Sequence, residues 1–588
     1  MNTFTRTTYN LFLTTLICLL SLTFSQAQET LREISLTQQV NASTSVIEGE
    51  VISKASYWDS DYSNIYTVNT IKVFKVFKGE NYAIIELITP GGTVEDMAQI
   101  TVPSLQLRKG DIGVFTLENA SNKLVSSKVI SKLFKPYSSV QGFYKYDLNT
   151  NFAVNPFSKK GNISSYFYEE IERLTKTKYK EIARFNVDLE YAKTNKSKAS
   201  LAPSNINFSP SNISAGTGSQ LTITGNDFGS IKGKVSFRNT EDGGATYIDA
   251  LDSQVTWSPS QITVEVPSFA GTGTIRVTDS NGDFSESTNQ LTVTYALINQ
   301  ISNGVAYPLQ AYGANGSGGF TWRKNSAFTA NSDANVAFTT AFNAWRCETG
   351  VNWVIGADTN VSIAANDAEN VIAFSTLPAG NLGVTTYYLG SCNGSTDWFV
   401  QSMDMIFDNT ASSPWNFDPN PNTTGFEYDF QSVALHELGH AHLLDHVIDD
   451  TDVMDFNIGL AQESRQLDSN NIISANLIQT RNTTNIVCAL PLMTNYNCPT
   501  ASIEDEELIT DINIYPNPTT GQFYIKSGAS VNLDKVVIYD VSGRLISSID
   551  VSSTSGVKTI NLPRVKKGLY FVNLHDENRM ITKKLIVE

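Results

Sequence analysis

The sequence predicts a multidomain, β-rich protein with one α+β domain in the second half of the chain. Its 588 residues are too many for a single hydrophobic core. Short runs of alternating Val, Ile, Phe and Tyr, broken by Gly, Pro and Asn, recur in three regions and are typical of β-strands. Between residues 296 and 492, helical periodicity alternates with strands. We therefore expect a β-rich N-terminal domain, an immunoglobulin-like β-sandwich, an α+β domain and a small C-terminal β-sandwich.

The first residues and the net charge predict an exported protein. Arg6, an apolar run over residues 11–24 and then Ser25-Gln26-Ala27 form a cleaved signal peptide, residues 1–27. The apolar run falls short of the roughly 20 residues that a membrane helix needs, and no later segment qualifies, so we expect no transmembrane segment in the mature chain. A formal charge of -16 argues against nucleic acid or an anionic membrane as the main partner.

The mature chain keeps four cysteines, and an even number in an exported protein predicts two disulfides. The expected pairs are Cys347 with Cys392 and Cys488 with Cys498. Their spacing does not resemble a zinc cluster.

Residues 28–190 are predicted to form the N-terminal β domain with a trailing helix. Strands are expected at Val46, Tyr66, Tyr82 and Asp111, in a small barrel or sandwich. The segment from Ser164 has apolar residues at helical spacing. Residues 191–202 are polar and lysine-rich, which predicts an exposed linker.

Residues 203–295 read as five strands, starting at Leu221, Lys234, Gln261, Gly273 and Leu291, with turn signals about every ten residues, as in an immunoglobulin-like sandwich. The stretch INFSPSNISAGTGSQLTITGNDFG, Ile206 to Gly229, and GTGTIRVTDSNG from Gly271 resemble a TIG/IPT domain. The resemblance implies a spacer or a binding module, and we favour the spacer.

The α+β segment, residues 296–492, contains the chemistry. A helix is expected around Phe338, Phe342 and Trp345, strands at Val371, Leu382 and Ser402, and a last helix capped by Asp468. Between them, the stretch HELGHAHLLDH, residues 436–446, holds four of the five histidines of the chain.

Side chains four positions apart share one face of a helix, so His436 and His440 can bind one metal ion, which for imidazole ligands favours zinc. Glu437 lies beside that face, where it can act as general base on a water molecule. Asp429 is expected to cap the helix. Candidates for a third ligand are His442, Asp445, His446, Asp449 and Asp450; of these, His442 is rotated about 200° from His440 and should face away.

H-E-x-x-H with a further histidine six residues on and a methionine beyond resembles the metzincin arrangement, in which His446 would be the third ligand and Met454 the methionine turn. The resemblance implies one catalytic zinc. It is also compatible with bound calcium, for which no ligands are assigned. LGVTTYYLG resembles the substrate-edge strand of matrixins, in which Gly383, Val384, Thr385, Thr386 and Tyr387 would pair with an extended peptide.

Two residues depart from the metzincin pattern. Leu443 stands where a glycine ends the helix in the left-handed conformation, which costs another residue about 1 kcal/mol, so we expect a differently shaped turn before His446. Phe456 stands where astacins and serralysins carry a tyrosine, which favours the matrixin side.

Residues 493–510 are expected to form a linker and residues 511–588 a small β-sandwich. Tyr515-Pro516-Asn517-Pro518, Gly521, Gly543-Arg544 and Lys567-Gly568-Leu569-Tyr570 resemble the type IX (Por) secretion C-terminal sorting domain. The resemblance implies contact with the secretion machinery, passage across the outer membrane, and a secreted or cell-surface location.

Together these patterns predict a secreted, matrixin-like zinc endopeptidase acting on extracellular proteins or peptides. The alternative is a cell-surface binding or adhesion protein with an inactive or structural zinc site.

Overall fold

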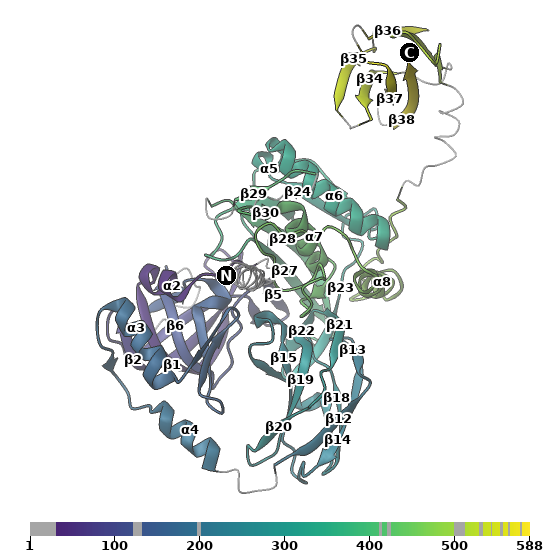
Figure 1. Ribbon diagram of the computed structural model, residues 1–588. Helices are drawn as coiled ribbons and strands as arrows, with labels where there is room; N and C mark the ends of the chain where they lie inside the picture. Colours follow the sequence, from purple (N-terminus) through teal and green to yellow (C-terminus); the bar gives the residue numbers. More distant parts are fainter. Residues whose placement is uncertain are drawn as a thin grey trace, which may run out of the picture. The chain divides into compact units, whose positions relative to one another are not determined.

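The computed structural model of the protein forms two compact units, Met1–Tyr496 and Asn497–Glu588 (Figure 1). It describes residues 31–121, 132–196, 202–410, 414–419, 425–498, 512–527, 533–541, 544–552, 557–562, 565–576 and 579–588. The predicted signal peptide, most of the 493–510 linker and Gly543 lie outside the described residues.

The N-terminal β domain is a barrel, because β1 pairs with both β2 and β6 and so closes the ring β1-β2-β3-β7-β6. Its strands are β1 (Ser45–Trp58), β2 (Ile65–Lys78), β3 (Ile84–Pro90), β6 (Ile112–Asn119), β7 (Leu133–Pro136), β8 (Phe143–Asp147), β9 (Phe152–Asn155), β10 (Ser158–Gly161) and the short β11 (Lys180–Glu181). All four predicted strands are present.

Three helices accompany the barrel: α2 (Leu36–Ala42), α3 (Tyr168–Thr175) and α4 (Val187–Lys196). The predicted amphipathic segment is confirmed, because Phe167 and Ile171 are buried in one of the barrel's two cores. Helix α4 continues into the predicted linker, so the first six residues of 191–202 are helical.

The immunoglobulin-like unit forms small sheets that enclose a core of Ile, Val and Leu. Its strands are β12 (Ser204–Ser209), β13 (Asn212–Ala215), β14 (Gln220–Asn226), β15 (Lys234–Asn239), β16 (Tyr247–Asp249), β17 (Val255–Trp257), β18 (Gln261–Glu265), β19 (Ala270–Thr278), β20 (Phe284–Glu286) and β21 (Thr292–Leu297). Strand β21 crosses the predicted boundary at 295/296 and pairs with the short strand β31 (Leu444–Asp445).

A mixed sheet forms the framework of the α+β region, in the order β25-β24-β26-β28-β27-β5-β4. Its own strands are β24 (Phe320–Lys324), β25 (Trp353–Ile355), β26 (Asn370–Ser375), β27 (Gly383–Cys392) and β28 (Asp397–Asp408), with β22 (Asn299–Ser302), β23 (Val305–Gln310), β29 (Trp415–Asn416) and β30 (Tyr428–Asp429) nearby. Four neighbouring strands are parallel, and β27 runs antiparallel to β28.

The last two strands of this sheet come from the N-terminal domain. Strands β4 (Gly92–Val94) and β5 (Met97–Val102) form a hairpin, and β5 pairs antiparallel with β27. The sequence did not indicate that a hairpin of the N-terminal domain would join the sheet of the α+β region.

Four helices complete the region: α5 (Ser326–Ala330), α6 (Ser332–Thr349), α7 (Phe430–Ala441) and α8 (Ser469–Thr484). Phe338, Phe342 and Trp345 of α6 are buried, as predicted, and α6 packs on α7 (Figure 1). Asp468 caps α8, as predicted.

A disulfide joins Cys392, at the end of β27, to Cys488. It excludes both predicted pairs, Cys347 with Cys392 and Cys488 with Cys498. Pairing by proximity in sequence was wrong because the fold brings together two cysteines 96 positions apart.

The second unit is a small β-sandwich with sheets β32-β33-β36 and β35-β34-β37-β38. The strands are β32 (Asn513–Tyr515), β33 (Gln522–Lys526), β34 (Lys535–Asp540), β35 (Leu545–Asp550), β36 (Lys558–Asn561), β37 (Gly568–Asp576) and β38 (Arg579–Val587). Across the described residues of both units, no helix has the length and apolar character required to cross a membrane.

Candidate metal centre

Helix α7 carries the first two histidines and is buried along almost its whole length. Asp429 caps it as predicted: its carboxylate accepts a hydrogen bond from the Ser432 amide and pairs with Arg465. The indole of Trp345 on α6 donates to the Leu435 carbonyl at 2.7 Å, one residue before His436. The helix that carries these two histidines is therefore held at its first turn by the Asp429 cap and along one side by Trp345.

The Nε2 atoms of His436, His440 and His446 converge on one point. They lie 2.9 Å (His436 to His440), 3.1 Å (His440 to His446) and 3.3 Å (His436 to His446) apart. Three nitrogens bound to one tetrahedral zinc would stand about 3.3 Å apart. All three imidazoles are buried. The structure thus brings together the three predicted ligands.

Each of these imidazoles uses its other nitrogen as a hydrogen-bond donor. The Nδ1 of His436 contacts the Val453 carbonyl at 2.7 Å and that of His440 the Leu444 carbonyl at 2.9 Å. The Nδ1 of His446 contacts a carboxylate oxygen of Glu241 at 2.7 Å.

Because these acceptors fix the proton on Nδ1, the three converging Nε2 atoms all present lone pairs to each other. A divalent metal ion bound at the centre would fit this arrangement, and the three residues could hold one.

Burial acts on the protonation of the ligands. It lowers the pKa of His436 to about 3 and that of His440 well below its ordinary value. For His446, burial lowers the pKa but the Glu241 carboxylate raises it, and the net change is a rise. Neutral imidazole is the form that binds metal.

Glu437 lies beside the three histidines and is fully buried. Its Oε2 accepts a hydrogen bond from the Thr385 hydroxyl at 2.7 Å, while Oε1 has no hydrogen-bond partner among the described residues. Burial raises the pKa of this carboxyl to about 8. A Cβ at Gly383 would stand 2.4 Å from Oε1, so the start of β27 passes against this carboxylate. One oxygen is anchored and the other is available for chemistry.

The turn after α7 takes the left-handed conformation that glycine usually provides. Leu443 has φ +65°, and its carbonyl accepts a hydrogen bond from the Ile298 amide at 3.0 Å. The expectation of a differently shaped turn was wrong, because the buried Leu443 side chain and the β21–β31 pairing hold the backbone in that conformation. His446 therefore reaches the other two histidines.

Met454 lies under the helix in a turn that follows His446. Its carbonyl accepts a hydrogen bond from the Val447 amide at 2.9 Å. A Cβ at Gly439 would stand 2.2 Å from the Met454 sulfur, so the absence of a side chain at Gly439 allows the methionine to approach. Phe456 packs against Leu31 and Val140 of the N-terminal domain.

Three of the other candidate ligands make contacts outside the three converging Nε2 atoms. His442 faces away from the centre, as predicted: its Nε2 lies 2.9 Å from the Thr349 hydroxyl, and its ring packs beside Trp345 and Trp353. Asp445 accepts a hydrogen bond from the His446 amide, and Asp449 from the amide and hydroxyl of Thr451.

The predicted substrate strand, residues 383–387, forms the first half of β27 and lies next to the candidate centre. Thr385 contacts Glu437, and the Tyr387 hydroxyl donates to the His440 carbonyl at 2.5 Å. Its outer edge is paired with β5 from Thr385 onward.

Sequence reasoning missed one residue that contacts the candidate centre, Glu241, and the role of another, Thr385. Nothing in the sequence of the predicted strand indicated that the Thr385 hydroxyl would donate a hydrogen bond to the Glu437 carboxylate. Glu241 comes 205 positions before His446, in another domain, and nothing in its local sequence indicates a role.

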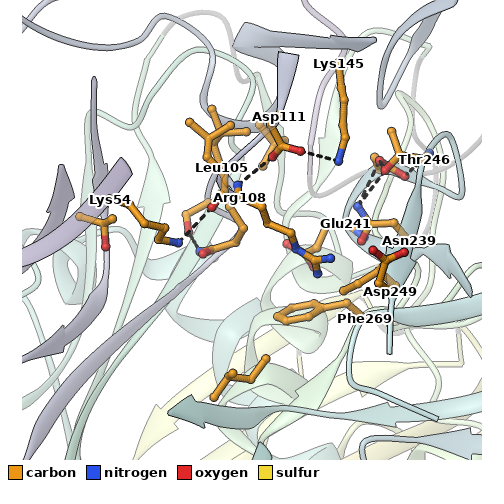
Figure 2. A pocket seen from close by; sticks show the side chains of 18 of the residues that line it. Lys54, Leu105, Arg108, Asp111, Lys145, Asn239, Glu241, Thr246, Asp249 and Phe269 are labelled. Atoms are coloured by element: carbon orange, nitrogen blue, oxygen red, sulfur yellow. Dashed lines mark hydrogen bonds and ion pairs between the residues drawn. The ribbon is translucent and has the colours of Figure 1, made fainter. Parts of the chain in front are cut away.

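Glu241 also lines a cavity of about 810 Å³ between the barrel and the immunoglobulin-like unit, together with Lys54, Arg108 and Lys145 (Figure 2).

Two family models match the chain. Residues 203–295 match the IPT/TIG domain, and residues 513–588 match the secretion system C-terminal sorting domain. Neither matching model describes a peptidase, and the comparison with curated proteins finds no significant match.

Among solved structures, a chain described as "Biofilm associated protein - BSP domain" aligns with 92% of this chain and 81% of its own length at 7% identity. Its TM-score is 0.12, and a likeness of this size carries no argument. The protein thus contains an IPT/TIG domain and a type IX secretion sorting domain, and it is exported across the outer membrane to the cell surface or the medium.

Proposed function

We propose that the protein is a secreted zinc-dependent endopeptidase. The observation that carries this proposal is the convergence of three Nε2 lone pairs, each fixed by a hydrogen bond at Nδ1. Beside them lies a buried glutamate, one of whose oxygens has no hydrogen-bond partner in the part of the chain that the structure describes. A structural zinc site has four protein ligands as a rule, whereas three ligands with an adjacent carboxylate are typical of hydrolytic sites.

Zinc held by His436, His440 and His446 would polarise a peptide carbonyl and make a water molecule more acidic. Glu437 acts as the general base: Oε1 accepts a proton from the attacking water and later delivers it to the leaving amine nitrogen. Thr385 holds the other carboxylate oxygen and so directs Oε1.

Strand β27 supplies backbone groups along one side of the candidate centre. An extended peptide paired with it would be positioned through main-chain hydrogen bonds, which favour proteins and peptides of varied sequence. Side-chain preference would then depend on the few side chains around the scissile bond.

Zinc analysis combined with a cleavage assay tests the proposal. We expect one zinc per chain, cleavage of a peptide library, loss of both after treatment with 1,10-phenanthroline and recovery of both on adding zinc. Stoichiometric zinc without cleavage of any peptide, by the full chain and by the Val102→Asp variant described below, would instead support a binding or adhesion protein with a structural zinc site.

A further inference from the structure

Glu241 lies in a short 3-10 turn, Thr240–Asp242, of the IPT/TIG domain. The Asn239 side chain accepts a hydrogen bond from the Glu241 amide, which fixes the start of this turn. The Glu241 carboxylate accepts from Nδ1 of His446, whereas His436 and His440 donate to carbonyls of their own region. One ligand of the candidate centre is therefore oriented by a charged group from a different domain.

The same domain pairs with the backbone just before His446 and contacts a side chain after it. Leu297 and Ala296 of β21 pair with Leu444 and Asp445. A Cβ at Gly243 would stand 2.5 Å from the Phe456 ring, so the IPT/TIG domain also contacts the segment beyond Met454.

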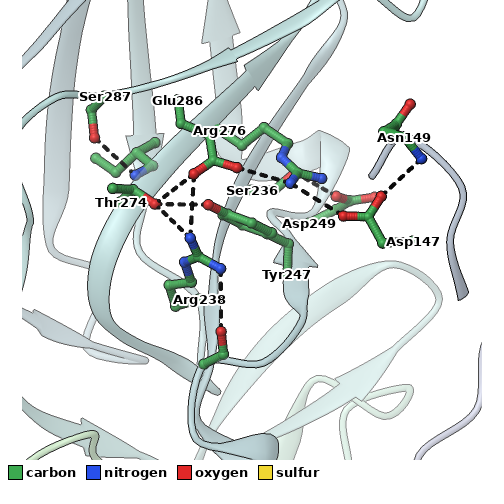
Figure 3. Close-up of polar contacts among 12 residues, drawn as sticks. Asp147, Asn149, Ser236, Arg238, Tyr247, Asp249, Thr274, Arg276, Glu286 and Ser287 are labelled. Carbon is green, nitrogen blue, oxygen red and sulfur yellow. Dashed lines mark hydrogen bonds and ion pairs between the residues drawn. The ribbon is translucent and has the colours of Figure 1, made fainter. Parts of the chain in front are cut away.

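The IPT/TIG domain in turn contacts the N-terminal barrel. Arg276 stacks on Tyr247 and pairs with Glu286, and it lies 3.8 Å from Asp147 of the barrel (Figure 3).

We propose that the IPT/TIG domain is part of the metal centre and that Glu241 is the positioning residue for His446. A carboxylate that accepts from a metal-binding imidazole fixes its tautomer and ring orientation and makes the opposite nitrogen a stronger ligand. This role differs from the spacer that the sequence favoured. The inference rests on the metal site of the proposed function and not on its peptidase activity.

Zinc affinity of the full-length chain, measured by competition with a chromogenic chelator, tests this role. We expect Glu241→Ala to bind zinc about 10- to 100-fold more weakly than the wild type. Glu241→Gln should lie between them, because its amide oxygen still accepts a hydrogen bond but carries no charge. Glu265→Ala, in β18 of the same domain, is the matched control and should bind as the wild type does.

A Glu241→Ala variant that binds zinc within twofold of the wild type would overturn the assignment. So would Glu241→Gln and Glu241→Ala with equally weakened affinity, since a general packing role predicts no rescue by the isosteric amide. A wild-type chain that binds no zinc would overturn the metal site itself.

A second inference concerns the outer edge of β27. Strand β5 pairs with it over six positions, from Val102 opposite Thr385 to Met97 opposite Gly390. Ala98 and Val102 are buried in the core of the α+β region, and the hydroxyls of Thr101 and Thr386 lie 3.3 Å apart. The hairpin is thus packed into the sheet by side chains as well as by its backbone.

The N-terminal domain also contacts the residues just before β27. Leu31 is fully buried and forms single bridges to Asn381 and Asn457, and the Arg32 amide donates to the Gly380 carbonyl at 2.7 Å. Leu31 thereby lies between Asn381, just before β27, and Asn457, just after the Met454 turn.

The geometry points to the N-terminal domain as an intramolecular occupant of the edge that a peptide substrate would use. One edge of a strand can pair with only one other strand, so β5 and a substrate compete for β27. This inference rests on the proposed function: the full-length chain is a latent form, and displacement of the β4–β5 hairpin activates it.

Val102→Asp in the full-length chain places a carboxylate in the apolar core under the hairpin and should expel β5. We expect cleavage of a fluorogenic peptide to rise at least tenfold, with unchanged zinc content. Ile84→Asp, at an exposed position of the same barrel, is the control and should leave the rate unchanged.

A cross-link provides the opposite perturbation. In Thr101→Cys/Thr386→Cys, oxidation should lower the residual cleavage at least tenfold, and mild reduction should restore it; the wild type treated in the same way controls for the native disulfides. Equal rates for Val102→Asp and the wild type, or for the oxidised and reduced cross-link, would overturn the inference. If no zinc-loaded variant cleaves any peptide, the proposed function fails instead.

Discussion

Replacing Gly383 by alanine tests the position assigned to the Glu437 carboxylate. The added Cβ would stand 2.4 Å from Oε1 and 2.8 Å from Cδ, whereas an ordinary contact begins near 3.4 Å. Because Thr385 holds the other oxygen, the carboxylate must shift by about 1 Å at the end that accepts the proton. A displacement of that size costs about 100-fold in rate, or about 2.7 kcal/mol of transition-state stabilisation.

The assay measures kcat and zinc content of Gly383→Ala in the Val102→Asp background, in which the edge of β27 is free. We expect kcat to fall about 100-fold with one zinc retained per chain, because the three atoms nearest the added Cβ all belong to Glu437, which is not a ligand. Gly390→Ala, at the far end of β27, meets the Gln401 side chain and the edge of the Phe399 ring instead of Glu437, and it serves as the control. Unchanged kcat in Gly383→Ala would refute the placement of Oε1 as the working oxygen.

Three further changes address the base, the turn and the disulfide. Glu437→Ala should retain zinc and lose cleavage, since the residue is assigned as base and not as ligand; measurable digestion of casein or gelatin by it would contradict that role. Leu443→Gly relieves about 1 kcal/mol of left-handed strain but removes a buried side chain worth about 2–5 kcal/mol. Urea unfolding should therefore show a lower free energy of unfolding, and a gain would contradict this balance. Cys392→Ser/Cys488→Ser opens a loop of 96 positions and should cost about 2–5 kcal/mol by the same measurement, while an unchanged midpoint would show that the bond adds no stability.

Local patterns predicted the parts of the candidate centre that depend on neighbouring residues. The cap at Asp429, the shared face of His436 and His440 and the rotation of His442 away from the centre all follow from helix geometry over one or two turns. Four strands of the barrel and five of the immunoglobulin-like unit followed from alternation, which needs only the residues within each strand.

Contacts between distant segments were beyond these patterns. The pairing of β5 with β27, the approach of Glu241 to His446 and the Cys392–Cys488 bond each join residues that are far apart in sequence. Strand propensity does not specify the partner of a strand, and cysteine spacing does not specify connectivity. Leu443 shows a related limit, since tertiary contacts hold a non-glycine residue in a conformation that local preference disfavours.

The passage of β21 from the IPT/TIG domain into its pairing with β31 has a consequence for cooperativity. Residues 203–295 and the α+β region share a strand, so neither can lose its structure without exposing backbone groups of the other. We expect calorimetry of the zinc-loaded chain to show one shared unfolding transition for these two regions, separate from that of the C-terminal unit. Fragments cut at residue 296 would divide that strand, and hydrogen exchange should find the amides of Leu297 and Leu444 protected to the same degree.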